Sequence, residues 1–168
     1  MTQTEFETFY RETARPLWGY LARICGNRTL ADDLLQETYL RFCRARIPAS
    51  RSEWRAYVYR IGTNLAADWW RHSARRAVET LEADVATSEG RGGESDLIRR
   101  RELDRAFAAL KPRERALLWL AYAEGMDHRE ISRALGLSRG SIKVLLFRAR
   151  RRLAGVLDRM GIGPEVLS

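Results

Sequence analysis

The stretch that decides the fold is residues 127–153, DHREISRALGLSRGSIKVLLFRARRRL. Asp127 and Glu130 have the spacing of a capping box, which predicts that a helix begins there. Gly136 can adopt the left-handed conformation of a tight turn, and Ser138 is placed to cap a second helix. Two helices joined by a short glycine turn form a helix-turn-helix, whose second helix enters the major groove of DNA.

The second of these helices has two contrasting faces when its residues are placed on a helical wheel. One face is apolar and is expected to pack in the core: Ile142, Leu145, Leu146, Ala149, Leu153 and Val156. The opposite side combines cations with a large aromatic residue, and we assign it to DNA: Arg139, Gly140, Lys143, Val144, Phe147, Arg148 and Arg151. The alternative is an ordinary helical hairpin with a solvated basic face.

Charge divides the chain into three parts. Residues 1–76 carry 13 basic and 8 acidic side chains, residues 77–96 carry 1 and 6, and residues 97–168 carry 16 and 8. No stretch shows the sustained alternation of a strand, whereas apolar residues recur at helical spacing in both basic parts. We therefore predict an all-α protein with two small helical domains, 1–76 and 97–160, a flexible acidic linker over 77–96 and a tail over 161–168.

Composition limits the classes of function. The net charge of +8 favours nucleic acid or an acidic membrane surface as a partner. No apolar run is long enough to insert into a membrane, and the N-terminus lacks the pattern of a signal peptide. Cys25 and Cys43 have no paired spacing and only two histidines accompany them, so we expect neither a metal site nor a cofactor, and reduced thiols in the cytoplasm.

The first basic part contains a second candidate DNA surface, in which aromatic residues alternate with arginines from Trp54 onward. This mixture is typical of proteins that stack unpaired bases on aromatic rings and contact phosphates with arginines. The alternative is that Trp54, Tyr57 and Trp69 belong to the core, which leaves the gathering of arginines unexplained. We assign these residues to exposed bases and their phosphates: Arg60, Trp69, Arg71, Arg75 and Arg76.

Local signals also predict the helices of the first part. The pattern of the first helix breaks at Gly26, Thr29 is placed to cap a second helix, and Ser52 to cap a third. The second helix carries an acidic outer face that begins at Asp32. That face either meets a basic partner or only keeps the protein soluble, and the residues alone favour the second reading.

Several of these segments resemble the extracytoplasmic-function (group IV) bacterial RNA polymerase sigma factors. The segments similar to their core-binding and −10-reading region 2 are 33–38 (DLLQET), 41–42 (RF) and 57–68 (YVYRIGTNLAAD). The segments similar to their −35-reading region 4 are 110–115 (LKPRER), 131–136 (ISRALG) and 142–150 (IKVLLFRAR). Both sets occur in the order that the family shows, with a short acidic segment between them.

The resemblance implies a non-enzymatic cytoplasmic subunit that gives core RNA polymerase its promoter specificity. Its implied partners are core RNA polymerase, promoter DNA and an anti-sigma factor. By the same resemblance, Asp33, Gln36 and Glu37 face basic helices of the polymerase. Asn64 would hold a flipped-out −10 base, a role that suits the hydrogen-bonding amide. The positions that touch the −35 element would be Lys143, Val144, Phe147 and Arg148.

Two residues differ from those usual in the family, and both differences bear on which promoter is recognised. Gly62 stands where the family usually has alanine, and Lys143 replaces a frequent arginine, which alone could make a forked contact to guanine. A stand-alone helix-turn-helix regulator is one alternative function; it would need no acidic polymerase-binding face. A nucleic-acid enzyme is another, and Asp32, Asp33 and Glu37 are the only dense carboxylate group for it.

Overall fold

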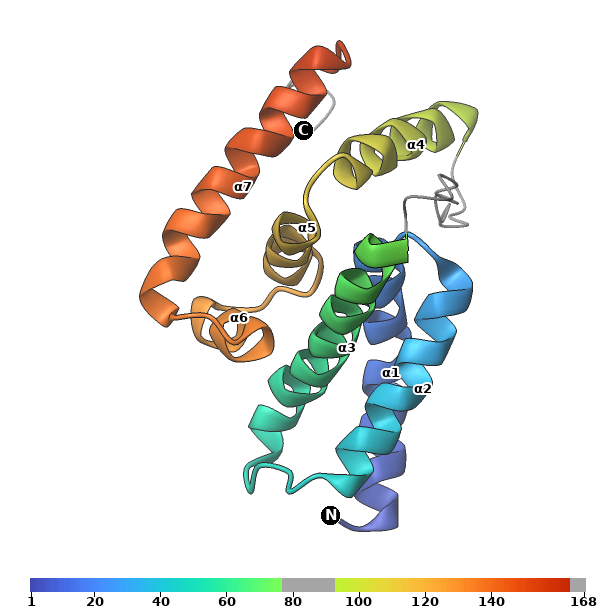
Figure 1. The fold of residues 1–168 in the computed structure, drawn as a ribbon, viewed down its shortest axis with the longest axis vertical. Coiled ribbons are helices and arrows are strands. Elements are labelled where there is room, and N and C mark those ends of the chain that lie inside the picture. The colour runs from blue at the N-terminus through green and yellow to red at the C-terminus, as the bar shows by residue number, and fades with distance from the viewer. Residues whose placement is uncertain (77–92, 164–168) are drawn as a thin grey trace.

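The computed structural model describes residues 1–76 and 93–163, without the side chains of 74–76. All regular structure in these residues is helical, which confirms the predicted all-α class. The first lobe, residues 1–76, contains α1 (Gln3–Cys25), α2 (Arg28–Arg44), a 3₁₀ turn η1 (Arg51–Glu53) and α3 (Trp54–Arg76). The second lobe, residues 93–163, contains α4 (Glu94–Ala108), α5 (Pro112–Leu118), a π-helical turn η2 (Trp119–Ala123), α6 (His128–Leu135) and α7 (Arg139–Arg159) (Figure 1).

Helices α1, α2 and α3 pack around an aromatic core. The rings of Phe9 and Phe42 stack with their centroids 5.2 Å apart, and Trp54 meets Phe9 edge-on at 5.6 Å. Edge-to-face and offset pairs add to the free energy of burial itself. Trp54 is therefore a core residue, as the alternative interpretation of the aromatic stretch allowed.

Three predicted boundaries were wrong. Asn27, not Thr29, caps α2: its Oδ1 accepts a hydrogen bond from the Leu30 N–H at 2.9 Å. The reason is that Gly26 turns the chain at φ 68°, and the extended residue that follows this turn is Asn27. Ser52 lies inside the η1 turn and does not cap α3. Helix α4 begins at Glu94, inside the predicted linker, because acidic residues suit a first helical turn. The rest of that linker, 77–92, lies outside the described residues.

Helices α6 and α7 form the predicted helix-turn-helix. The Asp127 carboxylate accepts from the Glu130 N–H at 2.8 Å, and the Glu130 carboxylate accepts from the Asp127 N–H at 2.9 Å, which completes the capping box. Gly136 ends α6 at φ 64°, and the Ser132 hydroxyl fastens the turn by donating to the Leu137 carbonyl at 2.6 Å. Ser138 does occupy the N-cap position of α7, but its side chain makes no capping hydrogen bond.

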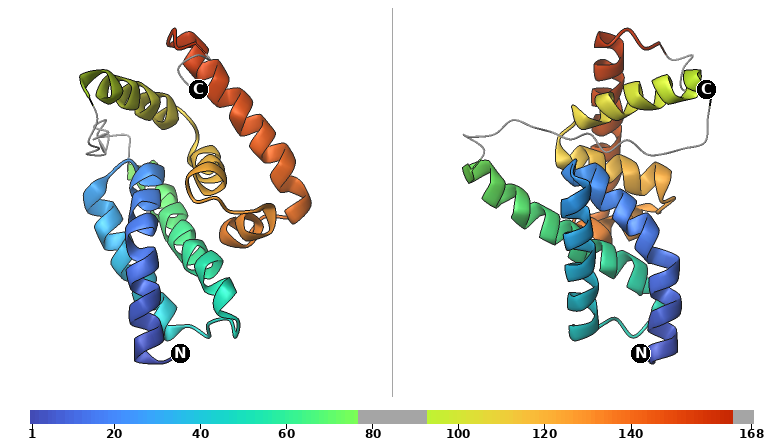
Figure 2. Two further views of the ribbon diagram at one scale, coloured as in Figure 1. Left: turned by 180° about the vertical axis from the view of Figure 1, so that it is seen from behind. Right: turned by 90° about the vertical axis from the view of Figure 1, so that its right-hand side faces the viewer.

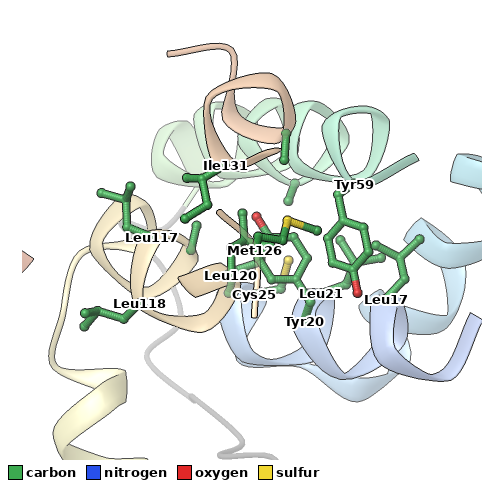
Figure 3. Packing of buried hydrophobic residues seen from close by; sticks show 14 of the residues in the cluster. Leu17, Tyr20, Leu21, Cys25, Tyr59, Leu117, Leu118, Leu120, Met126 and Ile131 are labelled. Carbon is green, nitrogen blue, oxygen red and sulfur yellow. The ribbon is translucent and has the colours of Figure 1, made fainter. Parts of the chain in front are cut away.

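The two lobes share one apolar core, which the sequence did not predict. In Figure 3, Tyr20 of α1 and Tyr59 of α3 lie in the same cluster as Leu117 of α5, Leu120 of η2 and Ile131 of α6. The second lobe sits with α6 against α3 and α5 against α1 (Figure 2). We call this interface between the lobes the seam. It fixes the orientation of the helix-turn-helix relative to the first lobe.

Candidate nucleic-acid interface

The outer face of α7 is a solvent-exposed surface of cations around an aromatic ring. All seven residues predicted there are exposed, with Val144 at 49% and Phe147 at 52% of their possible surface. The Arg151 guanidinium lies 5.8 Å from the centre of the Phe147 ring, which holds both side chains on the same surface. The helical wheel therefore sorted α7 correctly, since Ile142, Leu146 and Ala149 are buried on the other side.

The cations of this face have no acidic partner among the described residues, in contrast to their neighbours. Arg152, on the flank of α7, pairs with Glu114 of α5 at 3.0 Å. Arg150 donates to the Tyr122 hydroxyl at 2.8 Å. Within the described part of the chain, ion pairs involve none of Arg139, Lys143, Arg148 and Arg151. An uncompensated positive surface on the second helix of a helix-turn-helix has the charge required to contact DNA phosphates.

Asn64 lies on α3 at a crevice between the lobes. It is exposed, and with Thr63 and Trp70 it lines a cavity of about 350 Å³ whose other wall includes Pro112 and Leu135 of the second lobe. The amide is therefore accessible from solvent at the edge of this cavity.

The other predicted residues of α3 have different surroundings. Trp69 is half-buried and meets Trp70 edge-on at 5.6 Å, and Arg71 pairs with Asp68 of its own helix. The side chains of Arg75 and Arg76, at the end of α3, lie outside the described part.

Arg60, also predicted to contact DNA, is exposed and touches the turn of the helix-turn-helix. Its guanidinium lies against the turn, so close that a Cβ built on Gly136 would be 3.0 Å from its Cζ. Arg60 also donates a long hydrogen bond of 3.5 Å to the Arg133 carbonyl. Arg60 thus touches the second lobe while it remains exposed to solvent.

The acidic face of α2 is open. Asp33 and Gln36 are exposed, and Glu37 pairs with Arg41 one turn later at 2.7 Å. Asp32 accepts from the Trp18 indole N–H at 2.7 Å, so it braces α2 on α1. Figure 1 shows α2 on the side of the first lobe away from α6 and α7. This face thus remains available to a partner while the lobes are together.

Ion pairs across the seam are functional candidates that sequence reasoning missed. Arg23 of α1 pairs with Asp104 of α4. Arg55 of α3 donates to the Glu124 carbonyl at 2.7 Å and to its carboxylate at 3.1 Å. Arg133 of α6 forms a third ion pair, with Glu53 of η1, at 2.7 Å. Their members lie far apart in the chain, so no local pattern indicates them.

Arg115 is a buried cation at the seam. Only 6% of it is exposed, its Nε has no hydrogen-bond partner, and its Cζ lies 5.6 Å from the centre of the Trp70 ring. Burial lowers the pKa of this guanidinium. A ring face compensates a buried cation less well than a carboxylate does, so the closed seam carries an electrostatic cost.

The described side chains show no arrangement for metal chemistry. Within residues 1–73 and 93–163, no three metal-binding side chains gather at one place. Burial raises the pKa of the Cys25 thiol to about 12, which keeps it protonated and unreactive. The same part of the chain has no helix that is long and apolar enough to span a membrane.

Comparison of the sequence with known proteins identifies one family. A model of sigma-70 region 2 matches residues 9–76, and a model of sigma-70 region 4 matches residues 100–153. The chain is 31% identical over 162 residues to the RNA polymerase sigma factor CarQ of Myxococcus xanthus, a match that covers 94% of this chain and 92% of CarQ. It is 28% identical over 157 residues to the ECF RNA polymerase sigma factor SigL of Mycobacterium tuberculosis, covering 91% and 89%.

A solved structure has a similar fold. The sigma factor RpoE, in complex with the anti-sigma factor NepR from Bartonella quintana, matches with a TM-score of 0.74 and 20% identity over 92% of this chain and 97% of that one. The chain belongs to the sigma-70 family, as an extracytoplasmic-function sigma factor. Proteins of this class act with RNA polymerase in promoter recognition, and the predicted family and function are confirmed.

Proposed function

We propose that three surfaces divide the work of this sigma factor: α2 binds core polymerase, α3 binds the melted −10 strand, and the outer face of α7 binds the −35 element. The observation that carries the proposal is the α7 face, where cations without acidic partners surround the exposed Phe147. Single exposed aromatic residues are common on protein surfaces. An exposed ring among cations without acidic partners, on the second helix of a helix-turn-helix, is placed to contact a base or a sugar while the cations contact phosphates.

On α7, the division of labour follows from side-chain chemistry. Arg148 can donate two parallel hydrogen bonds to a base edge, whereas Lys143 supplies a point charge that suits a phosphate. Phe147 and Val144 offer apolar contact to a thymine methyl or a sugar. Gly140 leaves room at the start of the helix, where a built Cβ would meet only the Ser138 hydroxyl at 3.9 Å.

On α3, Asn64 is the residue proposed to read an unpaired base. Its amide can both donate and accept hydrogen bonds, and it is exposed at the edge of a crevice. A flipped base is read by hydrogen bonds and by stacking, and Trp69 lies one and a half turns further along the same helix. Arg71 and the arginines at the end of α3 are proposed to contact the phosphates.

On α2, Asp33, Gln36 and Glu37 are proposed to meet a basic surface of the polymerase. They lie on successive turns of one helix, and Asp33 has no ion-pair partner among the described residues. Charged residues at such a rim act chiefly on the rate and specificity of association.

Photo-crosslinking tests the assignment of the two DNA surfaces. Benzoylphenylalanine is placed at Phe147, at Asn64 or, as a control, at exposed Tyr10 of α1, and each protein is bound to core polymerase on a promoter. We expect position 147 to crosslink to the −35 element, position 64 to the −10 non-template strand, and position 10 to neither. The assignment fails if positions 64 and 147 crosslink no more than position 10.

We further propose that the chain has no enzymatic activity of its own and works in the cytoplasm. Its proposed partners, core RNA polymerase and the chromosome, are located there in bacteria. Incubation of the purified protein with labelled DNA or RNA and Mg²⁺ tests the first statement, and the nucleic acid should remain intact.

An anti-sigma factor is proposed as a further partner. The support is that RpoE, whose fold is similar, was solved with one. A partner recovered from the native cells should abolish transcription that depends on this chain, and excess sigma factor should restore it. A recovered partner that leaves transcription unchanged is not an anti-sigma factor.

A further inference from the structure

The second lobe contains a cavity that belongs to none of the three proposed surfaces. It has a volume of about 630 Å³ and lies between α4, α7 and the segment formed by α5 and η2, whose arrangement Figure 1 shows. Most of its wall is apolar, and the large apolar residues that line it are Leu103, Phe107, Leu118, Trp119, Leu153 and Leu157. Mainly apolar cavities of this size are typical of sites that hold one small organic ligand.

The large side chains of this cavity are open to solvent. Tyr122 exposes 64% and Leu103 exposes 42% of the possible surface. The rings of Phe107 and Trp119 pair with their centroids 6.1 Å apart, and both side chains are only half-buried. Because removal of apolar surface from water favours association, these side chains favour a ligand that has an apolar body.

The backbone of one cavity wall departs from α-helical geometry. Helix α5 continues into the π-helical turn η2, and Trp119, Tyr122 and Ala123 of that turn line the cavity. Single π-helical turns are rare, and they occur frequently at functional sites. The irregular turn is thus a second observation, independent of the volume and the lining, that indicates a binding site at this place.

Three arginines line the same cavity, and two of them carry an uncompensated charge. Arg100 of α4 is exposed and forms no ion pair with any residue that the structure describes. Arg150 of α7 is also exposed and donates to the neutral Tyr122 hydroxyl at 2.8 Å. Arg23 of α1 differs, because Asp104 pairs with it. Two such guanidinium groups beside an apolar cavity favour a ligand that carries an anionic group.

We propose that this cavity binds a free amphipathic carboxylate of the size of a medium-chain fatty acid. Its chain packs against Phe107, Trp119 and Leu153, and its carboxylate accepts hydrogen bonds from Arg100 and Arg150. The volume argues against a helix of a partner protein. A helix about 10 Å wide takes up roughly 420 Å³ per turn, so the cavity holds about one and a half turns, fewer than a bound amphipathic helix needs for its apolar anchors.

A ligand in this cavity would hold α4 on the rest of the second lobe. Helix α4 is largely exposed, and its buried residue is Ala106. A body that fills the space between α4 and α7 adds contacts that the free protein lacks, so binding should stabilise the folded state. The residues of the outer face of α7 do not line the cavity. Binding of the carboxylate is therefore compatible with binding of DNA by that face.

Displacement of a fluorescent dye from the full chain tests the proposal. The dye is 8-anilinonaphthalene-1-sulfonate, an anion with apolar rings, and the competitors are octanoate and octylammonium, which share a chain and differ in the sign of the head charge. We expect octanoate to displace the dye and to raise the melting temperature, and octylammonium to bind about tenfold more weakly, since it meets arginines instead of acceptors. Equal displacement by the two competitors, or by neither, would overturn the proposal.

Two pairs of variants assign the binding to this cavity. Arg100→Glu reverses a charge that lines it, and Arg101→Glu makes the same change at an exposed residue of α4 outside the lining. Ala154→Trp fills the cavity, and Ala108→Trp adds the same side chain at an exposed position of α4 outside the lining. Arg100→Glu and Ala154→Trp should each weaken octanoate binding about tenfold relative to their controls, with circular dichroism to confirm helical content. Octanoate binding equal to that of the controls places the ligand elsewhere and contradicts the proposal.

Two further measurements distinguish other occupants of the cavity. Vesicles of phosphatidylglycerol should leave the melting temperature unchanged; a rise with vesicles but not with octanoate would assign the cavity to a membrane lipid and overturn the proposal. Benzoylphenylalanine at Tyr122 should not crosslink to polymerase subunits in the holoenzyme. Crosslinks to a subunit, together with no binding of octanoate, would assign the cavity to a protein contact and also overturn the proposal.

Discussion

The guanidinium of Arg60 lies on the face of Gly136, so that a residue of the −10 surface and the turn of the helix-turn-helix touch across the seam. The relationship depends on two properties of Gly136. Its φ of 64° is in the left-handed region, and it has no Cβ to fill the space that Arg60 occupies.

Gly136→Ala is therefore expected to destabilise the protein by about 1–2 kcal/mol, the usual cost of a left-handed backbone for an L-residue. The clash with Arg60 adds little to this cost, because the long arginine side chain can adopt another rotamer. Gly136→Ala should therefore lower the free energy of unfolding by a similar amount in an Arg60→Ala background. Gly155→Ala is the matched control: Gly155 lies in α7 with open space around it, and alanine there should stabilise by about 0.5–1 kcal/mol. Urea unfolding measures all three; equal stability of the two alanine variants would contradict the account.

Asn64→Ala is expected to impair promoter opening more than polymerase binding, because the proposed role of the amide concerns a single unpaired base. Reactivity of −10 thymines with permanganate measures opening, and competition for core polymerase measures binding. An equal loss in both assays would remove Asn64 from the −10 surface.

Arg148→Ala is expected to weaken recognition of the −35 element by about 1–3 kcal/mol, the usual size of one good base contact. Arg152→Ala is the control, since Arg152 lies on the same helix but pairs with Glu114. Footprinting of holoenzyme on the promoter compares the two. Arg148 is not a −35 contact if its variant protects that element as well as the Arg152 variant does.

Asp33→Arg is expected to slow association with core polymerase, because it places a cation on the acidic face proposed to meet a basic surface. The defect should shrink as salt is raised and screens the repulsion. Glu7→Arg makes the same kind of change on α1 and should associate normally. Stopped-flow or surface-based association rates at two salt concentrations decide the matter.

The two cysteines should differ in reactivity. Cys25 is buried with its pKa raised to about 12 by that burial, whereas Cys43 is exposed. Brief iodoacetamide treatment of the folded protein should alkylate Cys43 and spare Cys25, and both should react in denaturant, as mass spectrometry would reveal. Alkylation of Cys25 at the rate of Cys43 would show that the first lobe opens readily.

The features that could be predicted from the sequence are those that depend on residues close together in the chain. The capping box at Asp127, the turn at Gly136 and the two faces of α7 depend on residues a few positions apart, and the structure has all three. Asn27 rather than Thr29 is the cap of α2, because the position of the cap depends on the direction of the chain after Gly26. Residue preferences alone do not determine that direction.

The seam could not be predicted in this way. Arg55 and Glu124 are 69 positions apart, and Arg23 and Asp104 are 81 apart. Their pairing depends on how two lobes dock, and apolar residues such as Leu117 and Ile131 fit the core of a separate domain equally well. For the same reason the sequence assigned Arg60 to DNA without revealing what else it contacts.

Run-off transcription with purified core RNA polymerase, with and without this protein, on promoter fragments from its own genome is the most direct test of the central claim. The account predicts specific transcripts that appear only when the protein is added and that are reduced by Asn64→Ala. No stimulation, together with binding of duplex promoter DNA by the protein alone, would contradict it and indicate a stand-alone helix-turn-helix regulator.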